Sequence, residues 1–370
     1  MADHVIPFVD LSDNIRSIEP QLLEALTAVV RDGGFSGGKF VDKFEKEYAA
    51  NLHLSHFAGV SNGSDALFLA LRALGIGPGD EVIVPGNTFI ATPFAAARLG
   101  AVPVFADCDP VTWEIDPASV EKCITPQTKA IIGVHLYGQA FPLDEINAIA
   151  KAHNLLVLED CAQSQQTLYK GSFVGGLSDA GCFSFYPTKN LGACGEAGGV
   201  ACRSEEADQT VRYLRNQGME EKYHHEMLGY NMRMDGFQAA VLSVKLPHLA
   251  AWNARRAQIV EKYHREITNP ALTFQGVLPY TQPAWYLAVA CVADRDHFMR
   301  YMDDCGIHCG IHYPIPCHLQ KAMAHLGYKE GDLPHVEYEC GHCVSLPLYP
   351  ELPESDVDKV IEACMGYRAK

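Results

Sequence analysis

Short apolar runs alternate with amphipathic stretches from about residue 55 to about residue 235. Five runs are rich in aliphatic residues and are interrupted or ended by Gly, Pro or Asp, which is typical of buried strands. They are HFAGV, DEVIVP, VPVFAD, KAIIGVHL and LLVLED. Between them, SDALFLALRALG, TPFAAARLG and LDEINAIAKAH repeat their apolar residues at helical spacing. This alternation is the sequence form of βαβ units, so it predicts a mostly parallel sheet with helices on both faces.

The rhythm changes beyond about residue 235. A long amphipathic stretch runs from GFQAAVLSVKL through EKYHREI and is interrupted by Pro247, so we expect two helices or one kinked helix. After Pro279 the pattern predicts a strand in WYLAVACVAD, a helix from about Arg295, a strand near IHCGIHY and a final helix in SDVDKVIEACMGY. We therefore expect a large domain over residues 1–245 and a smaller α+β domain over residues 246–370.

Composition and charge narrow the class of function. The 370 residues carry a formal net charge of −16, which argues against a nucleic-acid partner but not against a phosphorylated small molecule. No run approaches the ~20 apolar residues of a membrane span. The start, MADHVIPFVDL, lacks the basic and apolar regions of a signal peptide. The thirteen cysteines are therefore interpreted as reduced thiols, and we expect a cytoplasmic protein with no membrane partner.

Two strand ends offer groups for a flat, anionic ligand, since ligands of parallel sheets collect at the carboxyl ends of strands. SNGSDAL follows the first strand and opens a helix, so Gly63, Ser64 and Asp65 present backbone N–H groups and a hydroxyl to an anion. A simple helix N-cap explains these residues as well. Phe89, in PGNTFIAT, either covers a flat ligand or belongs to the core.

Two further strand ends carry charged side chains. In LLVLEDCAQS, strand alternation sends Glu159 and Asp160 to opposite sides of the sheet. A carboxylate there can cap a helix, face solvent or pair with a buried cation such as a protonated ring nitrogen. Lys189 follows the apolar run CFSFY and is either a surface lysine or an amine nucleophile in an apolar pocket. An anion cradle, a stacking aromatic, a carboxylate and an amine together form the set that pyridoxal phosphate requires.

On these segments the chain resembles the sugar aminotransferases of the DegT/DnrJ/EryC1/StrS family, which share the aspartate aminotransferase fold. The matching segments run in the family's order from residue 7 almost to the C-terminus. They are SNGSDALFLAL, GPGDEVIVPGNTFIAT, HLYGQ, LEDCAQS, FSFYPTKNLG with GEAGG, GYNMRMDGFQAA, HYPIPCHLQ and SLPLYP. The resemblance implies the α/β fold type I of pyridoxal-phosphate-dependent transferases. That fold has a mostly parallel seven-stranded sheet with helices on both faces and a smaller C-terminal α+β domain.

The resemblance also implies roles for individual residues. Lys189 would attach the cofactor and move the proton between the substrate carbon and the cofactor, and Asp160 would pair with the pyridine nitrogen. The other expected contacts are Gln163 at the ring hydroxyl, Phe89 on the ring face, and Gly63, Ser64, Asp65 and Ser184 at the phosphate. Asn231, in GYNMRM, would reach the phosphate bound by the neighbouring subunit, which implies a homodimer with shared active sites. Tyr186, Tyr313 and His318 would lie on the substrate side.

The implied reaction moves an amino group from L-glutamate to a keto sugar in aminosugar biosynthesis. HYPIPCHLQ is closest to enzymes acting on nucleotide-linked 3-keto-(deoxy)hexoses, while 4-keto nucleotide sugars and cyclic polyol ketones remain alternatives. Sugar dehydratases of the family have histidine in place of this lysine, so Lys189 favours transamination. A non-catalytic regulator on the same fold remains a further alternative.

Two other classes fit the sequence less well. GACGEAGG has the spacing G-x-x-G-x-x-G and follows no early strand–Gly-loop–helix unit, unlike a nucleotide-binding dehydrogenase. Several C-terminal residues have spacings that are typical of zinc ligands, namely Cys305, His308, Cys309, His312, Cys340, His342 and Cys343. Buried reduced cysteines are common in protein cores, so we expect no metal. The sequence predicts no role for Cys194 or Glu196.

Overall fold

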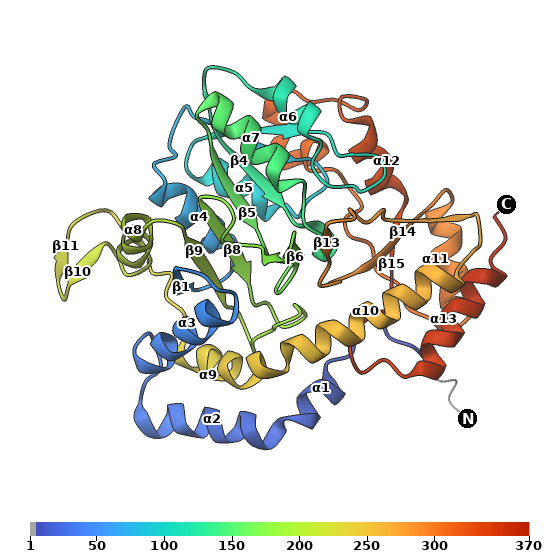
Figure 1. Ribbon diagram of the computed structural model, residues 1–370, viewed down its shortest axis with the longest axis horizontal. Helices are drawn as coiled ribbons and strands as arrows, with labels where there is room; N and C mark the ends of the chain where they lie inside the picture. Colours follow the sequence, from blue (N-terminus) through green and yellow to red (C-terminus); the bar gives the residue numbers. More distant parts are fainter. Residues whose placement is uncertain (1–4, 370) are drawn as a thin grey trace.

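The computed structural model describes residues 5–369, and its centre is a seven-stranded sheet (Figure 1). In spatial order the strands are β1 (His56–Val60), β9 (Gly198–Cys202), β8 (Ala180–Ser184), β5 (Leu156–Asp160), β4 (Thr128–Val134), β2 (Glu81–Pro85) and β3 (Val102–Ala106). β9 pairs antiparallel with both of its neighbours, and all other neighbouring strands pair in parallel. The mostly parallel sheet is thus confirmed, and all five predicted apolar runs form strands in it.

Helices cover both faces of this sheet, as predicted. Along β2, Val82 and Val84 pack in one hydrophobic core and Ile83 in the other, because successive side chains of a strand point to opposite faces. One core includes residues of α4 (Gly63–Ala73), α5 (Ala91–Arg98) and α8 (Glu205–Arg215). The other includes residues of α3 (Lys39–Asn51), α6 (Pro117–Cys123), α7 (Leu143–His153) and α9 (Gly236–Lys245). Burial on both faces explains why the strands are nearly continuous apolar runs.

The interruption at Pro247 separates two helices. α9 ends in the 3-10 turn η2 (Leu246–His248), and α10 (Leu249–Glu266) then carries the chain across to the C-terminal part (Figure 1). Proline removes a backbone N–H donor and crowds the preceding turn, so a break here is expected. At the other end of the chain, α1 (Ser12–Ser17) leads into α2 (Glu19–Asp32), which lies beneath α9, with Leu22 packed against Val241 in one small cluster.

The C-terminal part is an α+β unit with its own core. Its three-stranded antiparallel sheet consists of β12 (Leu272–Phe274), β14 (Ala288–Val292) and β15 (Cys343–Leu346). Its helices are α11 (Arg295–Asp304) and α13 (Glu354–Gly366), while α12 (Pro334–His342) packs Val336 and Cys340 in the core of the large sheet that includes α4, α5 and α8. Ile6 packs in the core of this unit, so the first described residues join it. Apart from these first residues, the division into two domains near residue 245 stays a prediction.

One predicted strand is wrong. IHCGIHY forms no strand and makes only isolated bridges, from Ile307 to Ile6 and from Gly310 to Ser345. Residues 311–313 pair with no strand, and the main-chain oxygen of His312 accepts a hydrogen bond from Tyr137 Oη. The tertiary contact at His312 therefore overrides the local apolar pattern.

The remaining elements are short. They are β6 (Leu168–Tyr169), β7 (Ser172–Phe173), β10 (Met219–Glu221), β11 (His224–His225), β13 (Thr281–Gln282), η1 (Leu136–Gly138), η3 (Cys317–Leu319) and η4 (Lys321–Leu326). β10 and β11 form a hairpin that protrudes from the body beside α8 (Figure 1). Across residues 5–369, no helix combines the length and apolarity needed to cross a bilayer.

Candidate active site

A cavity of about 440 Å³ lies at the carboxyl ends of β1, β2, β4, β5 and β8. Parallel strands place their carboxyl ends at one edge of a sheet, so segments far apart in the sequence meet there. The cavity brings together most of the residues expected from the sequence, namely Gly63, Ser64, Phe89, Asp160, Gln163, Ser184, Tyr186, Lys189 and Tyr313. It is also lined by residues that the sequence did not place in the site, namely Asn62, Thr88, Thr92, Thr188, Glu196, Tyr286 and His312.

Asp160 ends β5 and is buried at the cavity wall. Its Oδ2 accepts a hydrogen bond of 2.9 Å from Thr92 Oγ1, and its Oδ1 accepts one of 3.1 Å from the backbone N–H of Ala162. Burial raises the pKa of this carboxyl above its usual value, although both hydrogen bonds and the charge of Lys189 act in the opposite direction. A cation placed against Asp160 would offset this cost of burial and favour the ionised form.

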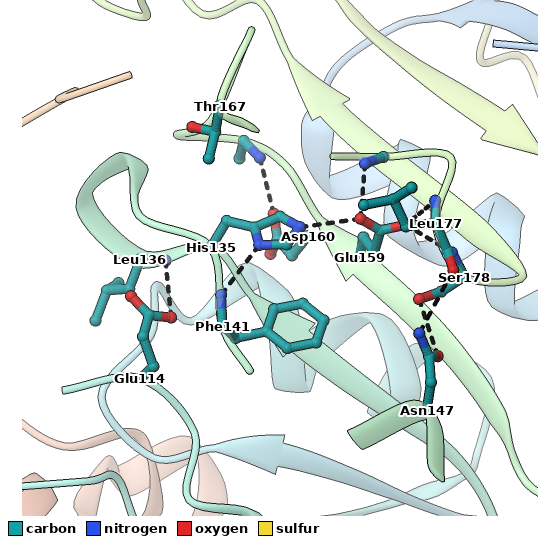
Figure 2. Close-up of polar contacts among 12 residues, drawn as sticks. Glu114, His135, Leu136, Phe141, Asn147, Glu159, Asp160, Thr167, Leu177 and Ser178 are labelled. Atoms are coloured by element: carbon teal, nitrogen blue, oxygen red, sulfur yellow. Dashed lines mark hydrogen bonds and ion pairs between the residues drawn. The ribbon is translucent and has the colours of Figure 1, made fainter. Parts of the chain in front are cut away.

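Glu159 points to the opposite side of β5 and is a structural residue, so the predicted alternation is confirmed (Figure 2). Its carboxylate accepts hydrogen bonds of 2.7–2.8 Å from the backbone N–H groups of Gly175, Leu177 and Ser178. His135 Nε2 lies 3.1 Å from Glu159 Oε2, while Nδ1 accepts from the backbone N–H of Phe141. Since Nδ1 accepts, Nε2 carries the proton and donates it to Glu159. Of these two adjacent carboxylates, Glu159 therefore stabilises the structure and Asp160 faces the cavity.

Lys189 lies in the turn between β8 and β9, where its backbone N–H donates to the oxygen of Tyr186. Its Nζ lies 4.2 Å from the ring centroid of Tyr286. Tyr286 Oη lies 3.4 Å from Thr188 Oγ1. Burial acts to raise the pKa of Tyr286, but the charges of Lys189 and Arg256 and the hydrogen bonds with Thr188 and Lys189 together hold this pKa below its usual value. The sequence did not reveal Tyr286, because it lies inside an apolar run that predicts a strand.

The amino end of α4 forms one wall of the cavity. Asn62 caps the helix by accepting a hydrogen bond of 2.8 Å from the backbone N–H of Asp65. A Cβ atom on Gly63 would lie 2.7 Å from Ser184 Cβ, so only glycine allows β8 to approach the helix this closely. The Asp65 side chain is used elsewhere, accepting from Ser61 Oγ and pairing with Arg98. Asp65, although expected at the phosphate, does not line the cavity: its backbone N–H donates to Asn62 and its carboxylate fixes the turn.

Aromatic and amide groups form another wall. Phe89 is 51% exposed, and its ring centroid lies 5.5 Å from that of Tyr313. Gln163 Oε1 accepts a hydrogen bond of 2.6 Å from the backbone N–H of Tyr137, and its Nε2 donates to Tyr313 Oη over 3.1 Å. Phe89 and Gln163 are thus held at the cavity, one presenting an open ring face and the other a fixed amide.

His312 is a cavity residue that the sequence grouped with possible zinc ligands. Its Nδ1 lies 2.9 Å from Ser345 Oγ. Burial and the nearby charge of Lys189 lower the pKa of His312 to about 4. His312 is therefore neutral at neutral pH and offers its other ring nitrogen as a hydrogen-bonding group rather than a charge.

Two further expected site residues, His318 and Asn231, lie away from the cavity. His318 is 1% exposed and does not line the cavity, because its Nε2 pairs with Glu337 Oε1 at 3.0 Å beneath the aromatic ring of Phe105. The position of His318 thus gives no support to a substrate contact. Asn231 is exposed and forms an isolated bridge with Asn216, also away from the cavity.

The cysteines and histidines proposed as an alternative zinc site do not converge. Within residues 5–369, the group whose ligand atoms lie within 4.8 Å of one another is His135, Glu159 and Cys161. The Glu159 carboxylate there already accepts three backbone hydrogen bonds. The position of Glu159 in this group is therefore explained by the loop of residues 175–178 that its carboxylate holds.

The residues present fit pyridoxal phosphate. Asp160 is a buried carboxylate without an ion pair among residues 5–369, which suits a protonated ring nitrogen. Lys189 presents an amine to the same cavity, and the close contact of Gly63 with Ser184 leaves backbone N–H groups and hydroxyls for a phosphate. Fold and site together define a pyridoxal-phosphate-dependent transferase.

Comparison with known proteins gives the family. The family described as DegT/DnrJ/EryC1/StrS aminotransferase matches residues 16–365, and this chain belongs to it. The chain is 44% identical to the erythromycin biosynthesis sensory transduction protein EryC1 of Saccharopolyspora erythraea, over 96% of this chain and 98% of that protein. It is 40% identical to the dTDP-3-amino-3,4,6-trideoxy-alpha-D-glucose transaminase of Streptomyces venezuelae, over 97% and 95% of the two chains. The crystal structure of S. venezuelae DesV with a ketimine intermediate matches with a TM-score of 0.96 and 39% identity, over 98% of each chain.

These matches confirm several expectations from the sequence. The chain is an aminotransferase, it has the fold of this family, and it depends on pyridoxal phosphate. Its relatives are nucleotide-sugar aminotransferases, so the chain is a sugar aminotransferase.

Proposed function

We propose that this enzyme moves the amino group of L-glutamate to the 3-keto position of a nucleotide-linked sugar. The observation that carries the proposal is that Lys189 and Asp160 face one cavity, with the amino end of α4 on its wall. The choice of C3 is supported by relatives whose names specify dTDP- or UDP-linked 3-amino, 3-dehydro or 3-oxo sugars. A cytoplasmic location fits such soluble nucleotide-linked substrates.

The residues would divide the chemistry between them. Pyridoxal phosphate supplies an electron sink for the carbon from which a proton is removed. Asp160 would keep a proton on the ring nitrogen, and Gln163 would orient the ring through its hydroxyl. Lys189 Nζ would attach the cofactor and then carry the proton to and from the substrate carbon. Phe89 would cover one ring face and exclude water from it.

The phosphate and the sugar would bind at opposite parts of the cavity. Backbone N–H groups at Gly63 and Ser64, with the hydroxyl of Ser184, would hold the phosphate at the amino end of α4. Tyr186, which is 47% exposed, and Tyr313 would contact the sugar. We add His312 to this group, since it lines the cavity in neutral form.

Glutamate alone should convert the bound cofactor, because amino transfer of this kind proceeds in two separate half-reactions. We expect the visible absorbance of the protein loaded with cofactor to change on addition of L-glutamate, with release of one 2-oxoglutarate for each site. The measurement is stopped-flow absorbance combined with assay of the keto acid. An unchanged spectrum with glutamate, but a changed one with another amino acid, would show that the donor is misassigned.

We further propose that the active enzyme is a homodimer in which Asn231 serves the partner's site. Asn231 is exposed and does not line the cavity of its own chain. Nearby, the β10–β11 hairpin and the segment after it expose apolar side chains, with Tyr223 78% and Leu228 86% exposed. Exposed apolar patches of this kind are typical of contacts between subunits. Arg233, two residues further along the chain, donates to Asn216 Oδ1 and Ser36 Oγ.

Mixed dimers test this arrangement. Asn231→Asp would place a carboxylate against the phosphate and should abolish activity by repulsion, and Lys189→Ala should be inactive as well. If Asn231 acts across the interface, each mixed dimer has one intact site, so purified mixed dimers should have about half of the wild-type activity. The assay is transaminase activity after co-expression with two different affinity tags. Purified mixed dimers without activity would place Asn231 in its own chain's site.

A further inference from the structure

A carboxyl group without an ionic partner lies beneath the active site. Glu339, on α12, is fully buried, and it forms no ion pair among the residues that the structure describes. Its Oε1 lies 2.6 Å from Tyr137 Oη, and its Oε2 accepts a weak hydrogen bond from the Cys340 thiol at 3.5 Å. An ionised carboxylate in such surroundings is costly unless it is paired. Neither the family's expected site nor the cavity includes Glu339.

The hydrogen bonds of Tyr137 determine where the proton is. Tyr137 Oη contacts both the main-chain oxygen of His312 and the carboxyl of Glu339. A phenol has one proton, and a main-chain oxygen can only accept, so this proton is donated to His312. The second contact then requires a proton on Glu339, which donates to Tyr137 Oη. Only the protonated acid satisfies both contacts.

Tyr137 contacts two residues that line the cavity, His312 and Gln163. Its side chain holds the main-chain oxygen of His312, next to Tyr313, while its backbone N–H donates to Gln163 Oε1. Gln163 Nε2 in turn donates to Tyr313 Oη. We propose that protonated Glu339 is a positioning residue that fixes the His312–Tyr313 segment and Gln163 at the cofactor through Tyr137. When the proton leaves, Tyr137 turns its own proton to the carboxylate and releases the oxygen of His312.

The surroundings of Glu339 bring the loss of its proton close to neutral pH. Burial raises the pKa of Glu339 to about 7, although hydrogen bonds with Tyr137, Cys340, Cys343 and Asn87 act in the opposite direction. Burial also raises the pKa values of the titratable groups that face it, namely Tyr137, Cys108, Cys291, Cys340 and Cys343. These groups are therefore neutral in the same range. The nearby cation, Arg295 on α11, donates to the main-chain oxygen of Cys340 at 2.6 Å rather than to the carboxyl.

The pH dependence of cofactor binding tests the proposal. We would measure the dissociation constant of pyridoxal phosphate for the wild type, Glu339→Gln and the control Glu362→Gln, whose residue is exposed on α13. The glutamine amide keeps a donor for Tyr137, so Glu339→Gln should match the wild type well below the pKa. Above it, the ratio of the wild-type constant to that of Glu339→Gln should rise by up to about tenfold per pH unit. The ratio of the wild-type constant to that of Glu362→Gln should stay near one at every pH, because ionisation of the phosphate and of other site groups affects both proteins equally.

Two further measurements test whether Tyr137 connects Glu339 to the cavity and whether Glu339 carries a proton. In a Tyr137→Phe background, adding Glu339→Gln should no longer change the pH dependence, since the connecting hydroxyl is gone. An infrared spectrum of the cofactor-free wild type at low pH should show the band of a protonated buried carboxyl that Glu339→Gln lacks. A flat ratio, an equal rise in the Tyr137→Phe background or absence of that band would overturn the proposal. None of these measurements uses an amino donor or a sugar, so they are independent of the proposed substrates.

Discussion

Lys189→Ala should abolish turnover while leaving the protein folded and able to bind its cofactor. Lys189 Nζ is the amine that the cavity presents, and its loss removes both covalent attachment and the proton carrier. The phosphate wall at Gly63, Ser64 and Ser184 is untouched, so pyridoxal phosphate should still bind, but reversibly. We expect the catalytic rate to fall roughly 10³-fold or more, as when a principal nucleophile is lost. The measurement is the single-turnover rate with saturating donor and acceptor.

The control for this variant is Lys151→Ala, in an exposed position on α7. Since exposed substitutions away from special features have small effects, it should keep the wild-type rate within about twofold. Dialysis separates the two expected properties of Lys189→Ala, because a non-covalent cofactor is removed and a covalent one is retained. Activity of Lys189→Ala within about tenfold of the wild type would disprove the assignment of the amine.

Asp160→Asn should keep the cofactor but lose most of the turnover. The asparagine can accept from the Ala162 N–H and donate to Thr92 Oγ1, whose own proton can then turn to Thr88 Oγ1 at 3.0 Å. The substitution therefore keeps the local hydrogen bonds and removes the charge. A neutral ring nitrogen is a weak electron sink, so we expect the rate to fall by about 10²- to 10³-fold.

Thr92→Val provides the comparison for this charge effect. It removes one hydrogen bond to Asp160 Oδ2 and leaves the carboxylate ionisable, so its rate should fall much less than that of Asp160→Asn. Rates and the absorbance of the bound cofactor are recorded together across pH. Similar losses for both variants would mean that the hydrogen bond, rather than the charge, is what Asp160 contributes.

Much of the sheet could be predicted because its strands are continuous apolar runs that end at marked residues. The period-two alternation of a strand was enough to predict that Glu159 and Asp160 point to opposite sides of the sheet. In the structure, three backbone N–H groups donate to Glu159, and Asp160 lines the cavity. The residues at the carboxyl ends of strands were also found, since parallel topology fixes where such ends meet. Pro247 marked a helix break for an equally local reason.

Residues whose roles depend on tertiary contacts were missed. Tyr286 precedes β14 and resembles any aromatic residue of a buried strand, and only the fold brings its ring to Lys189. The IHCGIHY segment has the composition of a strand, but the bond from Tyr137 to His312 holds it in another conformation. Glu339 gave no signal, because one glutamate on a short helix is normally exposed. His318 shows the opposite error, a residue with suitable chemistry that the fold buries against Glu337.

We propose that Lys189 and Asp160 form one site that transfers an amino group to a nucleotide-linked 3-keto sugar. The most direct measurement follows isotope-labelled amino nitrogen from L-glutamate into dTDP- and UDP-linked 3-keto sugars, 4-keto sugars and a cyclic polyol ketone. We expect labelled amine at C3 of a nucleotide-linked sugar, detected by mass spectrometry, and no label with Lys189→Ala. Label in a 4-keto sugar or polyol but in no 3-keto sugar would contradict the proposed substrate. Label transfer that persists in Lys189→Ala would contradict the site itself.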